Sequence, residues 1–245
     1  MISKAQLKFL ASLKEKKYRL KHKQFLVDNP KVIFEEISND ALDSIFATKK
    51  FFQEHEEQIP FDLFEALHDS DLKKISSSIT PQGIIAVFNM IPPKDFDKQD
   101  KNILLLENIQ DPGNMGTIIR TADWFGFENI FLSEDCVDVY NPKVVAATMG
   151  SIFHINIFQD LSLPDFTRDL KASGYQVLVS DLDGQADTIP SKLKTALIIG
   201  NEAKGVTRQL KSLADINLKI PKIGQAESLN AAVAAGIFMH KIKQP

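Results

Sequence analysis

Asn114 and Arg120 are the two residues whose types and spacing point most clearly to chemistry. They follow an expected strand, Leu104–Leu106, and the turn Asp111-Pro112-Gly113, and Asn114 is expected to be the N-cap of a helix that ends near Gly126. Arg120 stands six residues after Asn114, so its guanidinium lies about 9 Å further along that helix. An amide at the mouth of a helix and a guanidinium beyond it could together hold a polyanion.

Two further loops follow predicted strands and carry small or polar residues. The loop 200–205 comes after the apolar strand 195–199, and the loop 221–228 comes after the strand 216–220. Glycines let the backbone approach a ligand closely, and Ser228 or a neighbour is expected to cap the final helix. In a parallel sheet, the loops at the carboxyl ends of the strands line one crevice. The three loops are therefore expected to converge.

The residues after 101 predict a mainly parallel α/β sheet that is covered on both faces, because apolar strands alternate there with helical stretches. The expected strands lie at residues 103–109, 129–132, 152–158, 175–180, 195–199 and 216–220.

Residues 1–90 predict a smaller α/β domain. Its expected elements include a helix over 4–23 and strands at 24–27, 43–47 and 83–88. The segment 91–101 is polar and contains Pro92-Pro93, which is typical of a linker. The predicted division is therefore a domain over 1–90, a linker over 91–101 and a second domain over 102–245.

The charge is distributed unevenly along the chain. The whole chain carries a formal charge of -3, which argues against a nucleic-acid partner, because such binding depends on cations that neutralise phosphates. Residues 1–24, however, hold eight basic side chains against Glu15 alone, a net charge of +7. Both a solvated helix face and a nucleic-acid contact fit this segment.

Several classes of site are missing from the sequence. Cys136 is the single cysteine, so an internal disulfide is excluded, and the five histidines show no zinc spacing, so no metal is expected. The dinucleotide pattern GxGxxG, the phosphate loop GxxxxGKS/T and the nucleophile elbow GxSxG do not occur. The N-terminus lacks the apolar run of a signal peptide, and no apolar stretch approaches a membrane span. We therefore expect a cytoplasmic protein with no membrane contact.

Three segments together resemble the motifs of a known family. NMGTIIRTADWFG at 114–126, IIGNEAKGV at 198–206 and IPKIGQAESLNAAVAAGI at 220–237 are similar, in order and separation, to those of the SpoU (TrmH-like) family of RNA 2'-O-ribose methyltransferases in the SPOUT superfamily. KKYRLKHKQFLVDNP at 16–30 and TPQGIIAVF at 80–88 more loosely resemble the small, ribosomal-protein-like substrate-binding domain of many members. The chain departs from them in FLVDN at 25–29, where relatives commonly read FLVEG.

The resemblance implies a fold and a cofactor. It implies a deep trefoil knot near the C-terminus and S-adenosylmethionine bent among the second and third motif loops. The cofactor contacts then fall on Gly200, Ile220 and Leu229, together with Asn201 in the same loop as Gly200. The family also implies a homodimer through the C-terminal domain. Trp124 is expected to pack the helix that carries it into the core or the dimer.

The implied chemistry is methyl transfer from a sulfonium to a ribose 2'-hydroxyl. The family assigns activation of the hydroxyl to Arg120, but a guanidinium stays protonated, so we assign it to holding a phosphate and stabilising a developing alkoxide. Asn114 would orient the ribose or Arg120, and Glu202 would brace the second-motif loop or meet Arg120. Ser228 and Asn230 would hydrogen-bond the substrate or the motif loops.

Other functions remain open. The RNA substrate could be transfer RNA rather than ribosomal RNA, although the attached small domain favours ribosomal RNA by analogy. The chain could instead be an RNA-binding ribosome-assembly protein that keeps the fold without methylating, but the intact Asn114, Arg120, Ser228 and Asn230 speak against this. A methyltransferase for a small molecule fits the basic N-terminal segment less well than an RNA methyltransferase does.

Overall fold

The computed structural model describes residues 2–99, 102–184, 194–201 and 203–244. They form two compact units. The first unit consists of residues 1–91 together with Asp138–Gly150, and the second consists of Pro92–Val137 together with residues 151–245. The sequence predicts a single boundary near residue 91, so the assignment of Asp138–Gly150 to the first unit is a feature that the prediction did not contain.

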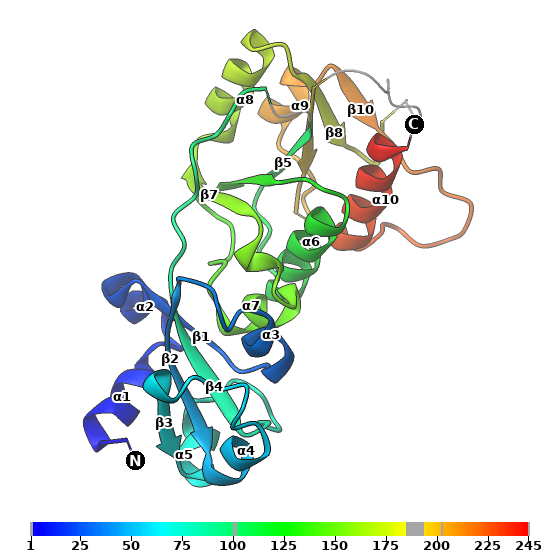
Figure 1. Cartoon of the computed structure of the whole chain (residues 1–245). Helices are drawn as coiled ribbons and strands as arrows, with labels where there is room; N and C mark the ends of the chain where they lie inside the picture. Colours follow the sequence, from blue (N-terminus) through cyan, green and yellow to red (C-terminus); the bar gives the residue numbers. More distant parts are fainter. Residues whose placement is uncertain (1, 100–101, 185–193, 202, 245) are drawn as a thin grey trace. The chain divides into compact units, whose positions relative to one another are not determined.

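The first unit is built on a four-stranded mixed sheet in the order β1-β4-β2-β3 (Figure 1). The strands are β1 (Gln24–Val27), β2 (Leu42–Thr48), β3 (Phe64–Leu67) and β4 (Ile84–Asn89). β4 pairs antiparallel with β1 and β2, whereas β2 and β3 are parallel. The short strand β3 is absent from the prediction, because its four residues carry too little pattern for a period of two to be recognised.

Helices surround this sheet, and one of them comes from the later segment of the chain. They are α1 (Lys4–Ser12), α2 (Lys16–His22), α3 (Pro30–Glu35), α4 (Lys49–Glu54), the 3-10 turn η1 (Phe61–Leu63), α5 (Asp69–Ile75) and α7 (Pro142–Thr148). α7 packs against β1, and α1 packs against α5. The core on that side includes Leu10, Leu13, Phe46 and Leu72.

The single helix predicted over 4–23 is wrong, because the chain breaks between α1 and α2. Leu13 is the C-cap of α1 and Glu15 is the N-cap of α2. The Arg19 guanidinium donates to the carbonyl oxygens of Leu13 (2.9 Å) and Lys14 (2.7 Å). These hydrogen bonds satisfy the carbonyls at the break, which a buried helix end requires.

The second unit contains a six-stranded parallel sheet in the order β10-β8-β9-β5-β6-β7, which confirms the predicted sheet. Its strands are β5 (Asn102–Leu106), β6 (Asn129–Ser133), β7 (Asn156–Leu161), β8 (Gln176–Ser180), β9 (Thr195–Ile199) and β10 (Ile216–Leu218). The central strand β9 is buried along its whole length, as its unbroken apolar run requires. The predicted start of the third strand at residue 152 is wrong, because left-handed Met149 and Gly150 lead into the 3-10 turn η2 (Ser151–Phe153).

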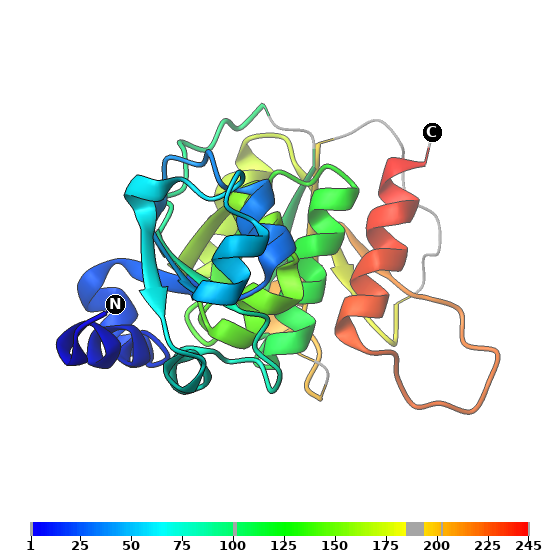
Figure 2. The same cartoon turned by 60° about the horizontal axis from the view of Figure 1, so that its bottom comes forward.

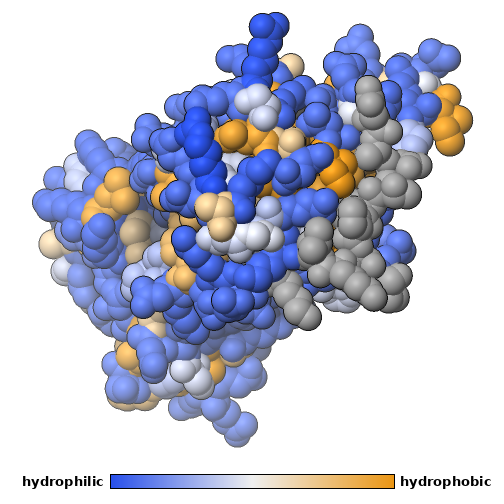
Figure 3. Space-filling view, turned by 90° about the horizontal axis from the view of Figure 1, so that it is seen from above, coloured by the Kyte–Doolittle hydropathy of each residue, from blue (hydrophilic) through white to orange (hydrophobic). Residues whose placement is uncertain are grey.

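The helices of the second unit are α6 (Pro112–Trp124), α8 (Leu163–Ala172), α9 (Arg208–Leu213) and α10 (Ala231–Lys243). Phe96, from the predicted linker, packs edge-on against Phe131 in the core of this unit. On the face of the molecule drawn in Figure 3, hydrophobic surface is limited to small patches within hydrophilic surface. No helix among the described residues has the length and apolar character needed to cross a membrane.

α6 and α10 lie side by side and run in the same direction (Figures 1 and 2). A Cβ atom placed on Gly236 of α10 would lie 3.5 Å from Cγ2 of Thr121 on α6, so a small residue is suited to this crossing. Further along, the Lys243 ammonium donates to the carbonyl oxygen of Gly126 (3.1 Å). The N-termini of both helices are therefore at the same end of the pair.

Candidate functional site

A pocket of about 530 Å³ opens at the carboxyl ends of β8, β9 and β10. Its walls are the loops that follow these strands and one face of α10. The predicted site residues that line it are Gly200, Asn201, Ile220, Ser228 and Leu229. The segment 180–183 also lines the pocket and was not predicted, although its position after a strand of the same sheet is a usable signal.

The loop 200–205 folds back tightly on itself. A Cβ atom on Gly200 would lie 2.5 Å from the carbonyl carbon of Gly205 and 2.5 Å from the Val206 nitrogen, a distance that no side chain tolerates. Glycine is therefore required at position 200 by the loop's own backbone as well as by any ligand. Gly205 has a φ of +65°, which turns the chain back toward β9.

The Asn201 side chain builds the same loop. Its Oδ1 accepts hydrogen bonds from the backbone nitrogens of Ala203 (2.8 Å) and Lys204 (3.2 Å), and its Nδ2 donates to the carbonyl oxygen of Asn108 (3.0 Å). Asn201 thus ties the loop after β9 to the loop after β5. The predicted residue Glu202 lies outside the described residues.

A buried carboxylate that the sequence analysis did not identify holds the far end of this loop. Glu107 follows β5 directly, and its two oxygens accept hydrogen bonds from the backbone nitrogen and the hydroxyl of Thr207, both at 2.7 Å. Thr207 in turn caps α9. A Glu directly after an apolar strand is the one sequence signal for this contact. The second-motif loop is therefore fixed at both ends.

Another ionic pair lies in the wall of the pocket. Lys211 on α9 donates to Asp181 after β8 at 2.7 Å, and both residues line the cavity. The same Oδ1 of Asp181 also accepts a hydrogen bond from the Asp183 nitrogen, and the Asp181 carbonyl oxygen accepts one from the Gly184 nitrogen. This turn is therefore a rigid wall.

Asn114 is not the N-cap of α6, so that prediction is wrong. The cap is Asp111, whose side chain accepts a hydrogen bond from the Asn114 backbone nitrogen at 2.8 Å. Proline favours the first helical position, and Pro112 therefore sets the start of the helix three residues earlier than expected. Asn114 consequently lies in the first turn of α6.

Asn230 joins the first motif to the third. It is the N-cap of α10, as its Oδ1 accepts from the nitrogens of Ala232 (2.9 Å) and Val233 (3.3 Å). Its Nδ2 donates to Oδ1 of Asn114 at 2.7 Å. Because Asn230 directly follows Leu229, this amide bridge lies at the edge of the pocket.

Arg120 lies on the exposed side of α6, nearly two turns beyond Asn114. The opposite side of the helix is buried through Met115, Ile118 and Ile119. Arg120 and Asn114 are outside the pocket lining and belong to the adjacent helix pair. The predicted site thus divides into a pocket and a neighbouring polar surface.

Trp124 does not pack into the core of its unit, so that half of the expectation is wrong. Its side chain is 84% exposed at the end of α6, and Val233 on the adjacent α10 is 51% exposed. The neighbouring Asp123 pairs with His154 at 2.9 Å.

The described residues offer neither a reactive thiol nor a cluster of metal ligands. Burial raises the pKa of the Cys136 thiol, which donates a hydrogen bond to the carbonyl oxygen of Leu106 at 3.3 Å. A thiol held in its protonated form is a poor nucleophile. Among the described residues, no three His, Cys, Asp or Glu side chains are grouped as metal ligands.

Comparisons with known proteins agree with the two-part sequence pattern. Residues 101–240 match the model of the SpoU rRNA Methylase family, and residues 4–86 match the MRM3-like substrate binding domain. The chain is 36% identical over 238 residues to the 23S rRNA (guanosine(2553)-2'-O)-methyltransferase RlmP of Bacillus subtilis (strain 168), covering 94% of this chain and 93% of that protein.

Solved structures resemble the chain along its whole length. A TrmH-family protein from Porphyromonas gingivalis is 33% identical with a TM-score of 0.85, covering 99% of this chain and 98% of that one. An AdoMet-bound rRNA methyltransferase from Sinorhizobium meliloti is 28% identical with a TM-score of 0.85, covering 99% and 95%. The motifs, the parallel sheet and these matches together show that the chain belongs to the SpoU rRNA methylase family.

Proposed function

We propose that this protein transfers a methyl group from S-adenosylmethionine to a ribose 2'-hydroxyl of ribosomal RNA. The observation that carries the proposal is the bridge between Asn230 and Asn114, because it brings the RNA-facing first motif to the edge of the pocket formed by the other two. The similarity to the Bacillus subtilis enzyme favours a guanosine of 23S rRNA as the target. We expect the protein to act in the cytoplasm, where this RNA is found.

The pocket fits S-adenosylmethionine in size and lining. Its volume of about 530 Å³ lies within the range of about 300–1,000 Å³ typical of small-molecule sites. Ile220, Leu229 and Phe238 provide apolar walls for a flat base, and the loop backbones offer polar groups for its edge. The cofactor supplies an electrophilic methyl group on a sulfonium. In this proposal Gly200, Ile220 and Leu229 touch it, whereas Asn201 shapes the loop.

Arg120 acts on the RNA side. Its guanidinium cannot accept a proton, but it can hold a phosphate with two parallel hydrogen bonds and stabilise negative charge on the 2'-oxygen. The RNA phosphate then serves as the proton acceptor. Asn114, fixed by Asn230, orients the ribose or Arg120.

Ser228 and Glu202 complete the proposed site. Ser228 lines the pocket one residue before Leu229, so its hydroxyl can hydrogen-bond the ribose or the loop. We keep Glu202 as a brace for the second-motif loop or a partner of Arg120.

The first unit is proposed to bind the RNA. Six lysines are exposed on or beside its first two helices: Lys4, Lys8, Lys16, Lys17, Lys21 and Lys23. Arg19 is buried and does not belong to this surface. Lysines that neutralise phosphates supply most of the sequence-independent affinity for RNA. We retain the division at residues 91–101 as a proposal for the domain boundary in the sequence.

A homodimer through the second domain and a trefoil knot near the C-terminus remain part of the proposal. The exposed Trp124 and Val233 lie on adjacent helices, and together they offer apolar surface for a contact with a second copy. The return of the chain after β10 through the long loop to α10, which packs on α6, is compatible with the knot.

The proposal is tested by incubating the protein with labelled S-adenosylmethionine and unmodified 23S rRNA. We expect label in alkali-resistant 2'-O-methyl dinucleotides, with a guanosine as the modified residue. Label on a base would contradict ribose methylation. Label in transfer RNA but not in ribosomal RNA would favour the transfer-RNA alternative.

Arg120→Ala should strongly lower the rate of transfer while leaving the cofactor bound. Removing one electrostatic stabiliser of a transition state lowers rates by about 10²–10³. We expect a loss of this size in single-turnover transfer, with an unchanged affinity for S-adenosylmethionine in calorimetry. Arg168→Ala, which removes an exposed arginine of α8, is the matched control. Equal loss of cofactor affinity would mean that Arg120 has a structural role.

A further inference from the structure

The segment Asp138–Gly150 is fixed to the first unit by buried contacts. Arg19, which is 2% exposed, donates through Nε (3.1 Å) and Nη2 to Oδ2 of Asp138. The Tyr140 hydroxyl donates to the carbonyl oxygen of Ile91 at 3.1 Å. A buried ion pair with additional hydrogen bonds is costly to break, so this segment is held firmly against the sheet.

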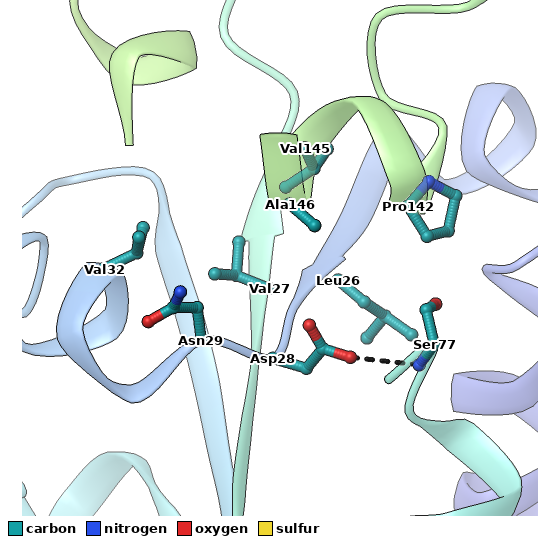
Figure 4. Close-up of a pocket in the computed structure, with 9 residues that line it drawn as sticks. All are labelled: Leu26, Val27, Asp28, Asn29, Val32, Ser77, Pro142, Val145 and Ala146. Atoms are coloured by element: carbon teal, nitrogen blue, oxygen red, sulfur yellow. Dashed lines mark hydrogen bonds between the residues drawn. The ribbon is translucent and has the colours of Figure 1, made fainter. Parts of the chain in front are cut away.

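This packing creates a pocket inside the first unit. The pocket has a volume of about 240 Å³ and lies between α7, the end of β1 and the loop 76–82. It adjoins a narrow crevice that shares part of its lining and is closed by apolar side chains, which Figure 4 shows: Leu26, Val27, Val32 and Val145. The apolar side chains that line the 240 Å³ pocket itself are those of Pro142 and Ala146, and polar groups form its rim.

The polar rim is held rigid before any ligand binds. Oδ2 of Asp28 accepts three hydrogen bonds, from the Ser76 hydroxyl (2.7 Å) and from the backbone nitrogens of Ser77 (3.0 Å) and Ser78 (3.1 Å). Figure 4 shows the Asp28 carboxylate directed at Ser77. A site that is already ordered loses little entropy on binding.

Exposed groups of differing chemistry surround this rim. Ser77, Ser78 and Gln82 offer hydroxyl and amide groups, and Lys143 on α7 offers a cation. Ile79, in the same loop, is 99% exposed. These groups suit a ligand of three parts. Ile79 can contact a flat apolar face, the hydroxyl and amide groups can bind a polar edge, and Lys143 can pair with a negative charge.

We propose that this pocket binds an unpaired nucleotide of the RNA substrate, an inference that rests on the proposed function. Single-stranded bases are recognised through apolar contact with their faces and hydrogen bonds to their edges. Here Pro142, Ala146 and the exposed Ile79 meet the base, the serines and Gln82 meet its edge, and Lys143 meets a phosphate. The segment 138–150 thereby contributes to RNA recognition although it lies within the part of the sequence that matches the methylase family.

Two variants test the pocket by different means. Lys143→Ala removes the cation, and Ala146→Phe fills the pocket without removing a polar group. Lys31→Ala is the matched control, because Lys31 is an exposed lysine of the same unit that does not line the pocket. The full-length proteins are titrated into a labelled 12-nucleotide single-stranded RNA and into 23S rRNA, and binding is followed by fluorescence anisotropy and filter retention.

We expect Ala146→Phe to weaken binding to both RNAs by about tenfold, the effect of losing one base contact. Lys143→Ala should weaken it about fivefold and make the dependence of log K on log salt shallower by about 0.7. Lys31→Ala should change affinity less than twofold, and cofactor affinity should be unchanged in all three. A duplex RNA of the same length should compete poorly.

The inference would be overturned if both pocket variants bound RNA as tightly as the wild type. It would also be overturned if Lys31→Ala lost as much affinity for RNA as the pocket variants do. Equally strong binding of the duplex would also overturn it, because the pocket would then not select an unpaired nucleotide. Binding is measured without methyl transfer, so these outcomes are separate from failure of the proposed function. If both pocket variants methylate ribosomal RNA as the wild type does, the proposed function stands and the proposed nucleotide pocket is wrong.

Discussion

Asn230 performs two tasks with one side chain. Its carbonyl oxygen caps α10, and its amide nitrogen reaches Asn114 in the first turn of α6. Serine or aspartate could also cap the helix, but neither combines a cap acceptor with an amide donor of this reach. An asparagine at position 230 is therefore suited to joining the first motif to the third, which lies far from it in the sequence. The Asn201 side chain also makes two contacts. Its oxygen closes the second-motif loop, and its nitrogen binds the carbonyl oxygen of Asn108.

Gly200→Ala should impair the cofactor site without unfolding the protein. The new methyl group would lie 2.5 Å from the backbone of residues 205 and 206, so the loop must move. We expect the affinity for S-adenosylmethionine to fall about tenfold or more, since overpacking of this kind costs about 1–3 kcal/mol. Calorimetric titration measures the change.

Gly224→Ala is the matched control for this prediction. A Cβ atom at position 224 meets open space, and Gly224 lines the same pocket. Its affinity for the cofactor should stay within twofold of the wild type. A loss of equal size in both variants would mean that the strain at position 200 is not the cause.

At the scale of elements, the segment Asp138–Gly150 is the clearest departure from the linear order of the chain. It follows β6 in sequence, yet its helix α7 packs on β1 of the first unit. Asn29, the N-cap of α3, adds a contact from its Nδ2 to the Met149 sulfur at 3.5 Å. The small domain therefore contains a structural piece that a cut at residue 91 would remove.

Arg19→Met should destabilise the protein strongly. It leaves the buried Asp138 carboxylate without its partner, and breaking one side of a buried pair costs about 3–5 kcal/mol. The double variant with Asp138→Leu should recover much of this loss but not all, because the carbonyls of Leu13 and Lys14 also lose their donor. Urea unfolding measures both. A double variant no more stable than the single one would mean that the ion pair is not the source of the effect.

The elements of the second unit could be predicted because their cause is local. Runs such as Ile103–Leu106 and Ala196–Ile199 are apolar on both sides and demand a central position in a sheet, and loops after parallel strands meet at one edge. Pro112 also marked the start of α6 in the sequence, although the prediction placed the N-cap three residues too late.

Other contacts join residues that are far apart in the sequence, and only the position of Glu107 after an apolar strand gave a local signal for one of them. Arg19 finds Asp138 and Glu107 finds Thr207 at separations of 119 and 100 residues. Each residue alone is an ordinary charged side chain in the sequence, and only tertiary packing decides that it is buried. The family resemblance indicated roles for the motif residues, but it did not indicate that Asn201 shapes the loop 200–205.

At the scale of the whole molecule, the proposed homodimer would form through α6 and α10. Trp124→Lys places a charge at the most exposed large apolar residue of this helix pair and should shift the proposed homodimer toward monomer. Sedimentation velocity at several concentrations measures this. Phe61→Ser is the control, since it removes an apolar residue that is comparably exposed but lies in the first unit. A wild-type particle that is monomeric at all concentrations would contradict the dimer.

The interleaving of the two units in sequence also sets an order on synthesis. Arg19 leaves the ribosome long before Asp138, which is 119 residues later. At about 5–20 residues per second this separation lasts about 6–24 s. During that time Arg19 has been translated, but the carboxylate that pairs with it in the folded first unit has not. The first unit therefore reaches its final packing only after β5, α6 and β6 have been translated.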